Sequence, residues 1–113
     1  MDILNQMLAD NKLPKKPRDL YEKEIERAVC KYAISKGSQV RKFTSPMYRS
    51  VPDRIFSQSW HPTFYIEFKR QGKEATPKQL REHERLRAIG SKVFVIDNVE
   101  AGKRLIDELY ENY

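Results

Sequence analysis

The segment Thr63-Phe64-Tyr65-Ile66-Glu67-Phe68-Lys69 decides the predicted fold of this chain. Its aromatic and β-branched residues favour an extended strand. Successive side chains of a strand point to opposite faces, so the apolar residues at positions 64, 66 and 68 share one face. Glu67 and Lys69 share the other face. The segment therefore predicts a strand with one buried side and one side on which an acid lies beside a base.

The segments on either side of this strand predict further helices and strands. Ile25 and Val29 recur at helical spacing, and Gly37 follows as a helix stop. Thr76-Pro77 is a typical helix start. The predicted elements are a helix from Asp19 to Lys36, strands at 39–43, 54–57 and 63–69, a helix from 76 to 90, a strand at 92–96, and a last helix that begins after Asp97 or Asn98.

The order of these elements is α-β-β-β-α-β-α, which predicts an α/β fold with a mixed four-stranded sheet flanked by helices. A length of 113 residues is sufficient for one hydrophobic core. Prolines at positions 14 and 17 interrupt the first segment. We therefore expect an N-terminal arm over residues 1–18 and a single domain over residues 19–113.

The charge of the chain favours a polyanionic partner. There are 22 Lys and Arg residues against 16 Asp and Glu, a net charge of +6. Nucleic acid is the commonest partner of such a surface, although excess lysine also serves solubility alone. Charge supports nucleic-acid binding without deciding it.

The cysteine count and the hydropathy indicate an intracellular protein. Cys30 is the single cysteine, so we expect neither an intrachain disulfide nor a disulfide-linked partner, and we expect Cys30 to act as a small core residue. No apolar run is long enough for a membrane span. We expect a cytoplasmic location, which is the host cytoplasm if a phage encodes the chain.

Asp53, Glu67 and Lys69 form the candidate catalytic set. Hydrolysis of a phosphodiester needs a divalent ion held by carboxylates, and magnesium takes one or two of them together with water. Asp53 and Glu67 lie on neighbouring predicted strands and provide that pair. Lys69 lies on the same face as Glu67, where it would orient a water or stabilise charge on the phosphate.

The segments Val51-Pro52-Asp53-Arg54-Ile55 and Ile66-Glu67-Phe68-Lys69 resemble the signature of the PD-(D/E)xK nucleases. A helix with Glu22 and Glu26 precedes them, and a helix that starts near Gln79 follows them. The segment Gly90-Ser91-Lys92-Val93-Phe94-Val95-Ile96 closes the pattern. This order is similar to the VRR-NUC branch of that superfamily over residues 20–98.

The resemblance implies a restriction-endonuclease-like core and dependence on Mg²⁺ or Mn²⁺. For stand-alone members it also implies homodimers that resolve four-way DNA junctions. It gives Asp53, Glu67 and the backbone carbonyl of Phe68 a role at the metal, and it gives Lys69 and Gln79 a catalytic role. Glu22 is the expected helix glutamate, bound directly or through water, with Glu26 as the alternative.

Each of these residues also has a purely structural interpretation. A lone E-x-K triplet is commonly an exposed ion pair on a sheet edge, and only its combination with Pro52-Asp53 and the helix near Gln79 is specific. Gln79 itself completes a capping box with Thr76. His83 is expected at the helix surface or at the edge of the site.

Several residues near this set are candidates for contacting nucleic acid. Tyr48 and Trp60 lie in predicted loops and could stack on a base, although core packing is an equal alternative for Trp60. The candidates for phosphate contacts are Arg54, Arg70, Lys73, Lys78, Arg81 and Arg85.

Three functions compete at this point. The first is a structure-selective, metal-dependent endodeoxyribonuclease that acts as a homodimer. The second is a nucleic-acid-binding module of the same fold that does not cut, and the third is a sequence-specific restriction-type enzyme, for which the chain is short. The candidate dimer surfaces are Leu105, Leu109, Tyr110 and Tyr113, or Ile3, Leu4 and Met7.

Overall fold

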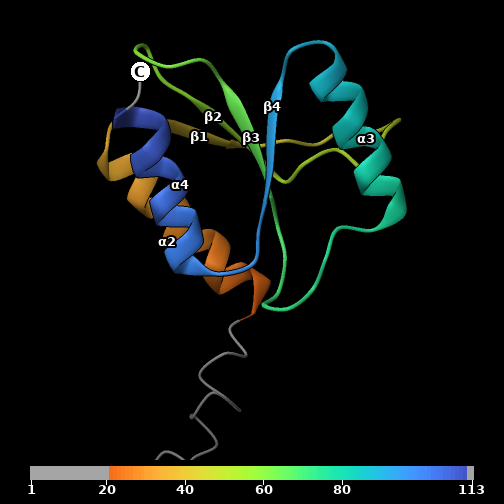
Figure 1. Cartoon of the computed structure of the whole chain (residues 1–113), viewed down its shortest axis with the longest axis horizontal. Coiled ribbons are helices and arrows are strands. Elements are labelled where there is room, and N and C mark those ends of the chain that lie inside the picture. Colours follow the sequence, from red (N-terminus) through yellow and green to blue (C-terminus); the bar gives the residue numbers. More distant parts are fainter. Residues whose placement is uncertain (1–20, 112–113) are drawn as a thin grey trace, which may run out of the picture.

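The computed structural model describes residues 21–111, and Figure 1 shows their arrangement. Every helix and strand predicted for these residues is present. The elements are α2 (Glu22–Ser35), β1 (Gln39–Lys42), β2 (Arg54–Ser57), β3 (Phe64–Phe68), α3 (Pro77–Ala88), β4 (Lys92–Ile96) and α4 (Val99–Glu111). Helix α2 begins at Glu22 after Tyr21 as its cap residue, so the predicted start at Asp19 was wrong. The expected arm at 1–18 and residues 3, 4, 7 and 113 lie outside the described residues.

The four strands form one mixed sheet in the order β1-β2-β3-β4. Strand β2 is antiparallel to both of its neighbours, β1 and β3. Strands β3 and β4 are parallel, because α3 connects them. Arg54 lies opposite Ile66 in the β2–β3 pair. This register brings the start of β2 next to the end of β3, where the candidate catalytic residues lie.

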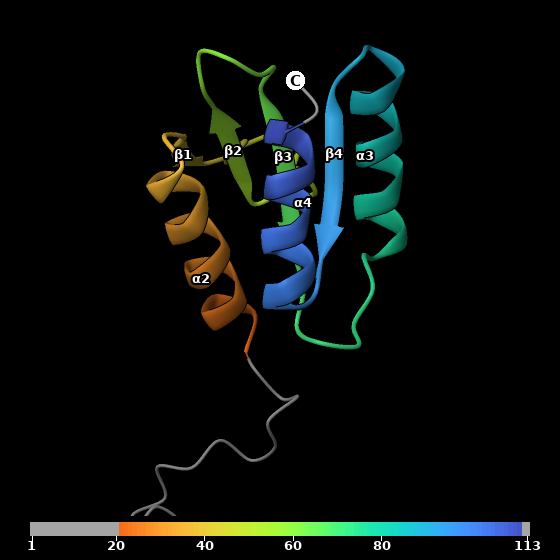
Figure 2. The same ribbon diagram turned by 60° about the vertical axis from the view of Figure 1, so that its left-hand side comes forward.

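Helices cover both faces of the sheet. Figures 1 and 2 show α2 and α4 side by side on one face and α3 alone on the other. The core lies under α2 and α4, where Ile66 of β3 packs with Val29 of α2 and Ile106 of α4, all three fully buried. Gly102 permits the close approach of the two helices, because a Cβ there would lie 2.4 Å from a methyl carbon of Val29. The predicted α/β fold with a mixed four-stranded sheet is confirmed.

Local signals account for the ends of the helices. Gly37 follows α2 with φ of +102°, a conformation that glycine adopts without strain. Thr76 and Gln79 form a reciprocal capping box at the start of α3. Of the two candidate caps of α4, it is Asn98 whose Oδ1 accepts a hydrogen bond of 2.7 Å from the amide of Ala101.

Most apolar residues of helix α4 pack in or against the core of the domain. Leu105, Leu109 and Tyr110 pack against the core, and the Tyr110 ring meets the Trp60 ring edge-on at 5.5 Å. Trp60, which is 40% exposed, therefore packs on the domain rather than standing free in a loop. Cys30 likewise packs against the core. None of the helices in residues 21–111 is long and apolar enough to cross a membrane.

Candidate active site

Three carboxylates from distant parts of the sequence meet at one end of the sheet. Glu22 is the first residue of α2, Asp53 immediately precedes β2, and Glu67 lies within β3. One carboxylate oxygen from each lies within 4.8 Å of the other two. The three differ in exposure, since Glu22 is exposed, Asp53 is half-buried and Glu67 is buried. The cluster therefore opens to solvent on the side of Glu22.

The pairing of β2 with β3 positions Asp53. The register that pairs Arg54 with Ile66 continues to place Asp53 opposite Glu67. The Oδ2 atom of Asp53 accepts a hydrogen bond of 2.7 Å from the backbone amide of Phe68, and the carbonyl of Asp53 accepts one of 2.9 Å from Phe43. These bonds fix the orientation of the Asp53 carboxylate against the strand that carries Glu67.

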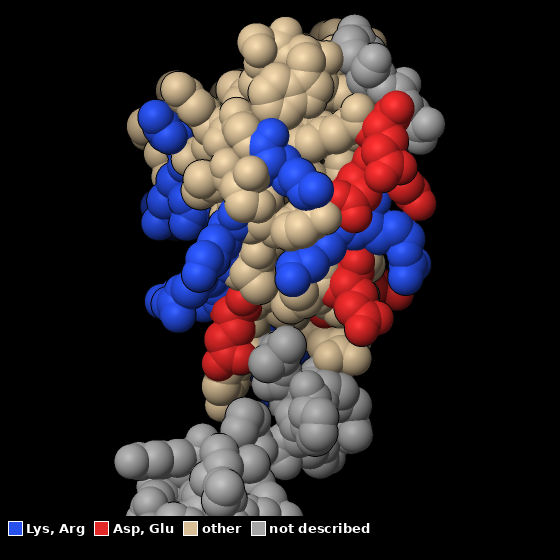
Figure 3. Space-filling view, turned by 90° about the vertical axis from the view of Figure 1, so that its left-hand side faces the viewer, with Lys and Arg blue, Asp and Glu red and all other residues tan. Residues whose placement is uncertain are grey.

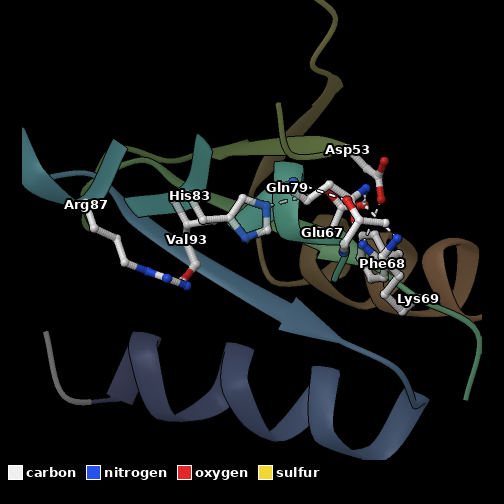
Figure 4. A network of polar contacts seen from close by, with 9 residues as sticks. Asp53, Glu67, Phe68, Lys69, Gln79, His83, Arg87 and Val93 are labelled. Atoms are coloured by element: carbon white, nitrogen blue, oxygen red, sulfur yellow. Dashed lines mark hydrogen bonds and ion pairs between the residues drawn. The ribbon is translucent and has the colours of Figure 1, made fainter. Parts of the chain in front are cut away.

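Glu67 is held by one side chain that directly follows β3 and two from α3, as Figure 4 shows. The Gln79 Nε2 atom donates a hydrogen bond of 3.1 Å to Glu67 Oε2. The Lys69 Nζ atom lies 4.0 Å from the same oxygen. The Nε2 atom of His83 lies 3.6 Å from the other oxygen, Oε1. Three cationic or polar groups thus surround a carboxylate that is only 1% exposed.

Burial and like charge perturb the acids of the cluster. Burial, followed by the negative charge of Asp53, raises the pKa of Glu67 from its ordinary 4.5 to about 8. The same two causes raise the pKa of Glu22. An acid this perturbed, next to two further carboxylates, is typical of a site that binds a cation or performs acid-base chemistry.

Of the two positions predicted for His83, the helix surface was wrong, whereas the edge of the site is confirmed by its contact with Glu67. His83 is fully buried between α3 and the sheet. Burial, followed by the charge of Arg87, lowers the pKa of His83 from its ordinary 6.5, which favours the neutral ring. Within residues 21–111 neither ring nitrogen has a hydrogen-bond partner, and neither does Glu67 Oε1. These three unpartnered atoms lie together beneath the carboxylate cluster.

Gln79 both caps helix α3 and contacts Glu67. Its Oε1 atom accepts a hydrogen bond of 2.9 Å from the Thr76 amide, and its own amide donates 3.2 Å to the Thr76 hydroxyl, which completes the capping box. The remaining Nε2 group then points to Glu67. The cap fixes the amide of Gln79 so that it presents a donor, not an acceptor, to the carboxylate.

The structure separates the two candidate glutamates of α2. Glu22 belongs to the carboxylate cluster. Glu26 is turned to β2, where its Oε2 accepts a hydrogen bond of 2.9 Å from Arg54 Nε. Arg54, predicted as a phosphate contact, is therefore half-buried and paired with Glu26.

The other predicted nucleic-acid contacts fall in different places. Tyr48 lines the hollow that contains Glu22 and Asp53, and it also lines a second hollow that contains Lys78 and Arg81. The guanidinium of Arg70 lies 5.8 Å from the Tyr21 ring centre. Lys73 lies apart, in a hollow with Val95 and Asp97.

Three cations of the site were not predicted from the sequence. Lys23, Lys42 and Arg49 line the hollow with Glu22 and Asp53. Lys23 follows Glu22 in α2, Lys42 ends β1, and Arg49 lies in the loop between β1 and β2 that leads to Asp53. Their nearness in sequence to Glu22 or to that loop was the available signal.

The residues of the cluster fit a small divalent cation. Carboxylate oxygens are the ligands that Mg²⁺ and Mn²⁺ prefer, and three of them converge here. The unpartnered Oε1 of Glu67 and the raised pKa of its carboxyl are the expected marks of a ligand set whose charge a cation would balance. Asp53, Glu67 and Glu22 are the residues that could hold it, and the Phe68 carbonyl stays a prediction.

Known proteins are similar to this chain in sequence and in fold. No protein-family model matches the chain. "Putative nuclease p44" of Acyrthosiphon pisum secondary endosymbiont phage 1 is 38% identical over 81 residues, which are 72% of this chain and 87% of that protein. A solved structure described as "VRR_NUC domain" has a TM-score of 0.67 and 28% identity, and covers 81% of this chain and 96% of its own.

A second solved structure, described as "VRR_NUC domain protein", has a TM-score of 0.65 at 20% identity and covers 82% of this chain and 90% of its own, which supports the fold. The fold is thus that of a nuclease domain. The chain belongs to the VRR-NUC family, and the resemblance drawn from its motifs is confirmed.

Proposed function

We propose that this protein is a divalent-metal-dependent endonuclease that hydrolyses phosphodiester bonds of DNA; the relative named as a putative nuclease supports the nuclease activity. The observation that carries the proposal is the convergence of Glu22, Asp53 and Glu67 within 4.8 Å, beside Lys69, in a VRR-NUC fold. A surface that only binds phosphates has no use for three converging carboxylates, because they repel the ligand. This argues against the module that binds without cutting.

Each side chain has a defined task in this proposal. Asp53, Glu67 and Glu22 hold Mg²⁺ or Mn²⁺, which when bound lowers the pKa of an attacking water and offsets charge on the phosphate. The Lys69 ammonium, 15% exposed, adds a positive charge beside Glu67 where charge develops on the phosphate. Gln79 keeps the Glu67 carboxylate in one orientation through its donated hydrogen bond.

The test is cleavage of labelled linear duplex, single-stranded, flap and four-way-junction DNA with Mg²⁺, with Mn²⁺ and with chelator. Glu67→Gln, Asp53→Asn and Lys69→Ala should each lower the cutting rate by at least about 100-fold. Glu24→Gln is the matched control, because Glu24 is exposed on α2 outside the cluster. Cutting by Glu67→Gln at the wild-type rate, with Mn²⁺ present, would remove Glu67 from the mechanism.

We further propose that the active form is a two-fold homodimer that cuts four-way junctions. Two symmetric cuts across a junction match a two-fold pair of sites. Leu105, Leu109 and Tyr110 pack against the core but stay partly exposed, so they remain candidates for the dimer surface, as do Tyr113 and Ile3, Leu4 and Met7. Sedimentation should give twice the chain mass of 13.4 kDa at micromolar concentration. A monomer that still cuts junctions would contradict this proposal.

A further inference from the structure

A cationic groove runs beside the carboxylate cluster, between helix α2 and the edge strand β1. None of the predicted nucleic-acid contacts except Arg54 lies in it. Its charged lining consists of five cations and one acid, namely Lys23, Arg27, Lys31, Lys42, Arg54 and Glu26. Glu26 is paired with Arg54, which leaves the four remaining cations without a balancing acid in the lining.

This groove is continuous with the candidate active site. Lys23, Glu26 and Lys42 line both the groove and the hollow that contains Glu22 and Asp53. A strand whose phosphate lies at the carboxylates can therefore continue directly into the groove.

The helix contributes its cations as one stripe. Lys23, Arg27 and Lys31 are spaced by four residues, so they follow one another along a single face of α2. At a rise of 1.5 Å per residue the stripe covers about 12 Å. One strand of duplex DNA places a phosphate about every 3.4 Å of helix axis, so the stripe has the length of about three to four phosphates.

The stripe is unfavourable for the helix itself. Like charges four residues apart destabilise a helix by about 0.2–0.5 kcal/mol per pair. Lys23 also lies in the first turn of α2, where the helix dipole disfavours a cation. All three side chains are exposed, and no acid of residues 21–111 forms an ion pair with any of them. The sequence therefore retains a repulsive arrangement that a polyanion would relieve.

The rest of this side of the molecule does not share the charge. Figure 3 shows Lys and Arg with little acid between them on the left of the view, toward α2 and β1, whereas on the right, toward α4, most of the Asp and Glu lie interspersed with further Lys and Arg. Helix α4 carries four acids against two bases, namely Glu100, Asp107, Glu108 and Glu111 against Lys103 and Arg104. On this side of the molecule the excess of positive charge therefore lies at the groove and not over α4.

We propose that the groove between α2 and β1 binds the sugar-phosphate backbone of duplex DNA next to the phosphate that is cut. The proposal rests on the proposed nuclease function, because it takes the same DNA as ligand. Lys23, Arg27 and Lys31 contact successive phosphates of one strand, and Lys42 contacts the phosphate nearest the carboxylates. These contacts position the substrate and carry no sequence preference.

The test measures DNA binding in chelator, where cleavage plays no part. Anisotropy titrations with a labelled duplex of about 20 base pairs give the affinity and its dependence on salt. The charge-removal variant is Lys23→Gln/Arg27→Gln/Lys31→Gln. The matched control, Lys92→Gln/Lys103→Gln/Arg104→Gln, removes the same two Lys and one Arg from exposed positions outside the groove.

The groove variant should lower the slope of log affinity against log salt by about 2 to 3, because each lost phosphate contact removes about 0.9 from it. Its affinity at about 100 mM salt should fall at least about tenfold. The control variant should stay within about twofold of the wild type. The charge-preserving Lys23→Arg/Lys31→Arg should keep the wild-type slope. If the triple groove variant does not fold, Arg27→Gln alone should lower the slope by about 1.

Equal slopes for the groove and control variants overturn the proposal, as does a wild type that does not bind the duplex. Tighter binding of a polyglutamate peptide than of DNA, lost in the groove variant, would assign the groove to an acidic protein and also overturn the proposal.

Different results would overturn the proposed nuclease function and the proposed DNA-binding groove. A wild type that cuts DNA while the groove variant binds it unchanged leaves the nuclease function standing and removes the groove. If the groove variant lowers the slope as predicted but the wild type cuts no DNA with Mn²⁺, the groove stands and the nuclease function is removed.

Discussion

The two faces of strand β3 both hold buried residues but have opposite chemistry. The side chains of Phe64, Ile66 and Phe68 are apolar and fully buried in the core with α2 and α4. Glu67, 1% exposed, points to the other face, where two more carboxylates crowd it and one of its oxygens has no hydrogen-bond partner among the described residues. The first face stabilises the fold, whereas the second lowers the stability of the metal-free protein and supplies the candidate site.

The largest effect should come from breaking the apolar face. Ile66→Ala leaves a cavity at the centre of the core and should lower the free energy of unfolding by about 2–5 kcal/mol. For a domain of this size that is a fall in melting temperature of at least about 8 °C. Urea denaturation followed by circular dichroism checks it. A loss below about 1 kcal/mol would mean that β3 is not the centre of the core.

A smaller effect of opposite sign should come from neutralising the polar face. Glu67→Gln keeps an oxygen that accepts the hydrogen bond from Gln79 but removes the repulsion with Asp53. In chelator the variant should therefore melt higher than the wild type, by several degrees at pH 8. A variant less stable than the wild type at that pH would show that the buried charge is already balanced.

The pH dependence of this gain has a fixed sign. The folded pKa of Glu67, about 8, lies above its ordinary value of 4.5, so the folded state holds the proton more tightly than the unfolded state does. The contribution of Glu67 to stability is fully present below about pH 4.5 and is lost as the pH rises through about 8. The gain of Glu67→Gln over the wild type should accordingly be small at pH 5 and grow toward pH 8. Melts at several pH values in chelator test this, and a gain that shrinks as the pH rises would contradict it.

The smallest effect on stability should come from Gln79→Glu, which separates the two tasks of that residue. Glutamate preserves the capping box with Thr76, so in saturating Mn²⁺ the stability should change by less than about 1 kcal/mol. It cannot donate to Glu67, so cleavage should fall about 10- to 100-fold. Gln79→Ala, which loses both interactions, is the comparison. Wild-type cutting by Gln79→Glu would reduce the residue to a helix cap.

The sequence predicted the apolar face well, because alternation in β3 depends only on backbone geometry. The same alternation placed Glu67 and Lys69 on one face, and the pairing of β2 with β3 then brings Asp53 to them. These relations are local or follow from the order of the strands, so they can be predicted without coordinates.

Relations between α2, α3 and the sheet could not be predicted in the same way. The four-residue spacing of Gln79 and His83 showed that they share a helix face, but only the packing of α3 shows that His83 is fully buried against Glu67. Glu22 and Glu26 likewise share a helix face, and only the docking of α2 turns Glu26 to Arg54 and leaves Glu22 with the cluster. Lys73, close in sequence to the site, lies in a separate hollow.

The central claim is that Glu22, Asp53 and Glu67 share one divalent ion, and calorimetric titration with Mn²⁺ tests it most directly. The proteins are the wild type, Glu67→Gln, and Glu24→Gln, whose exposed carboxylate lies outside the cluster. The wild type and Glu24→Gln should show the same saturable binding, and Glu67→Gln should bind at least about tenfold more weakly. Equal affinity in all three proteins would contradict the shared site, since the most buried carboxylate of the cluster would then play no part in holding the ion.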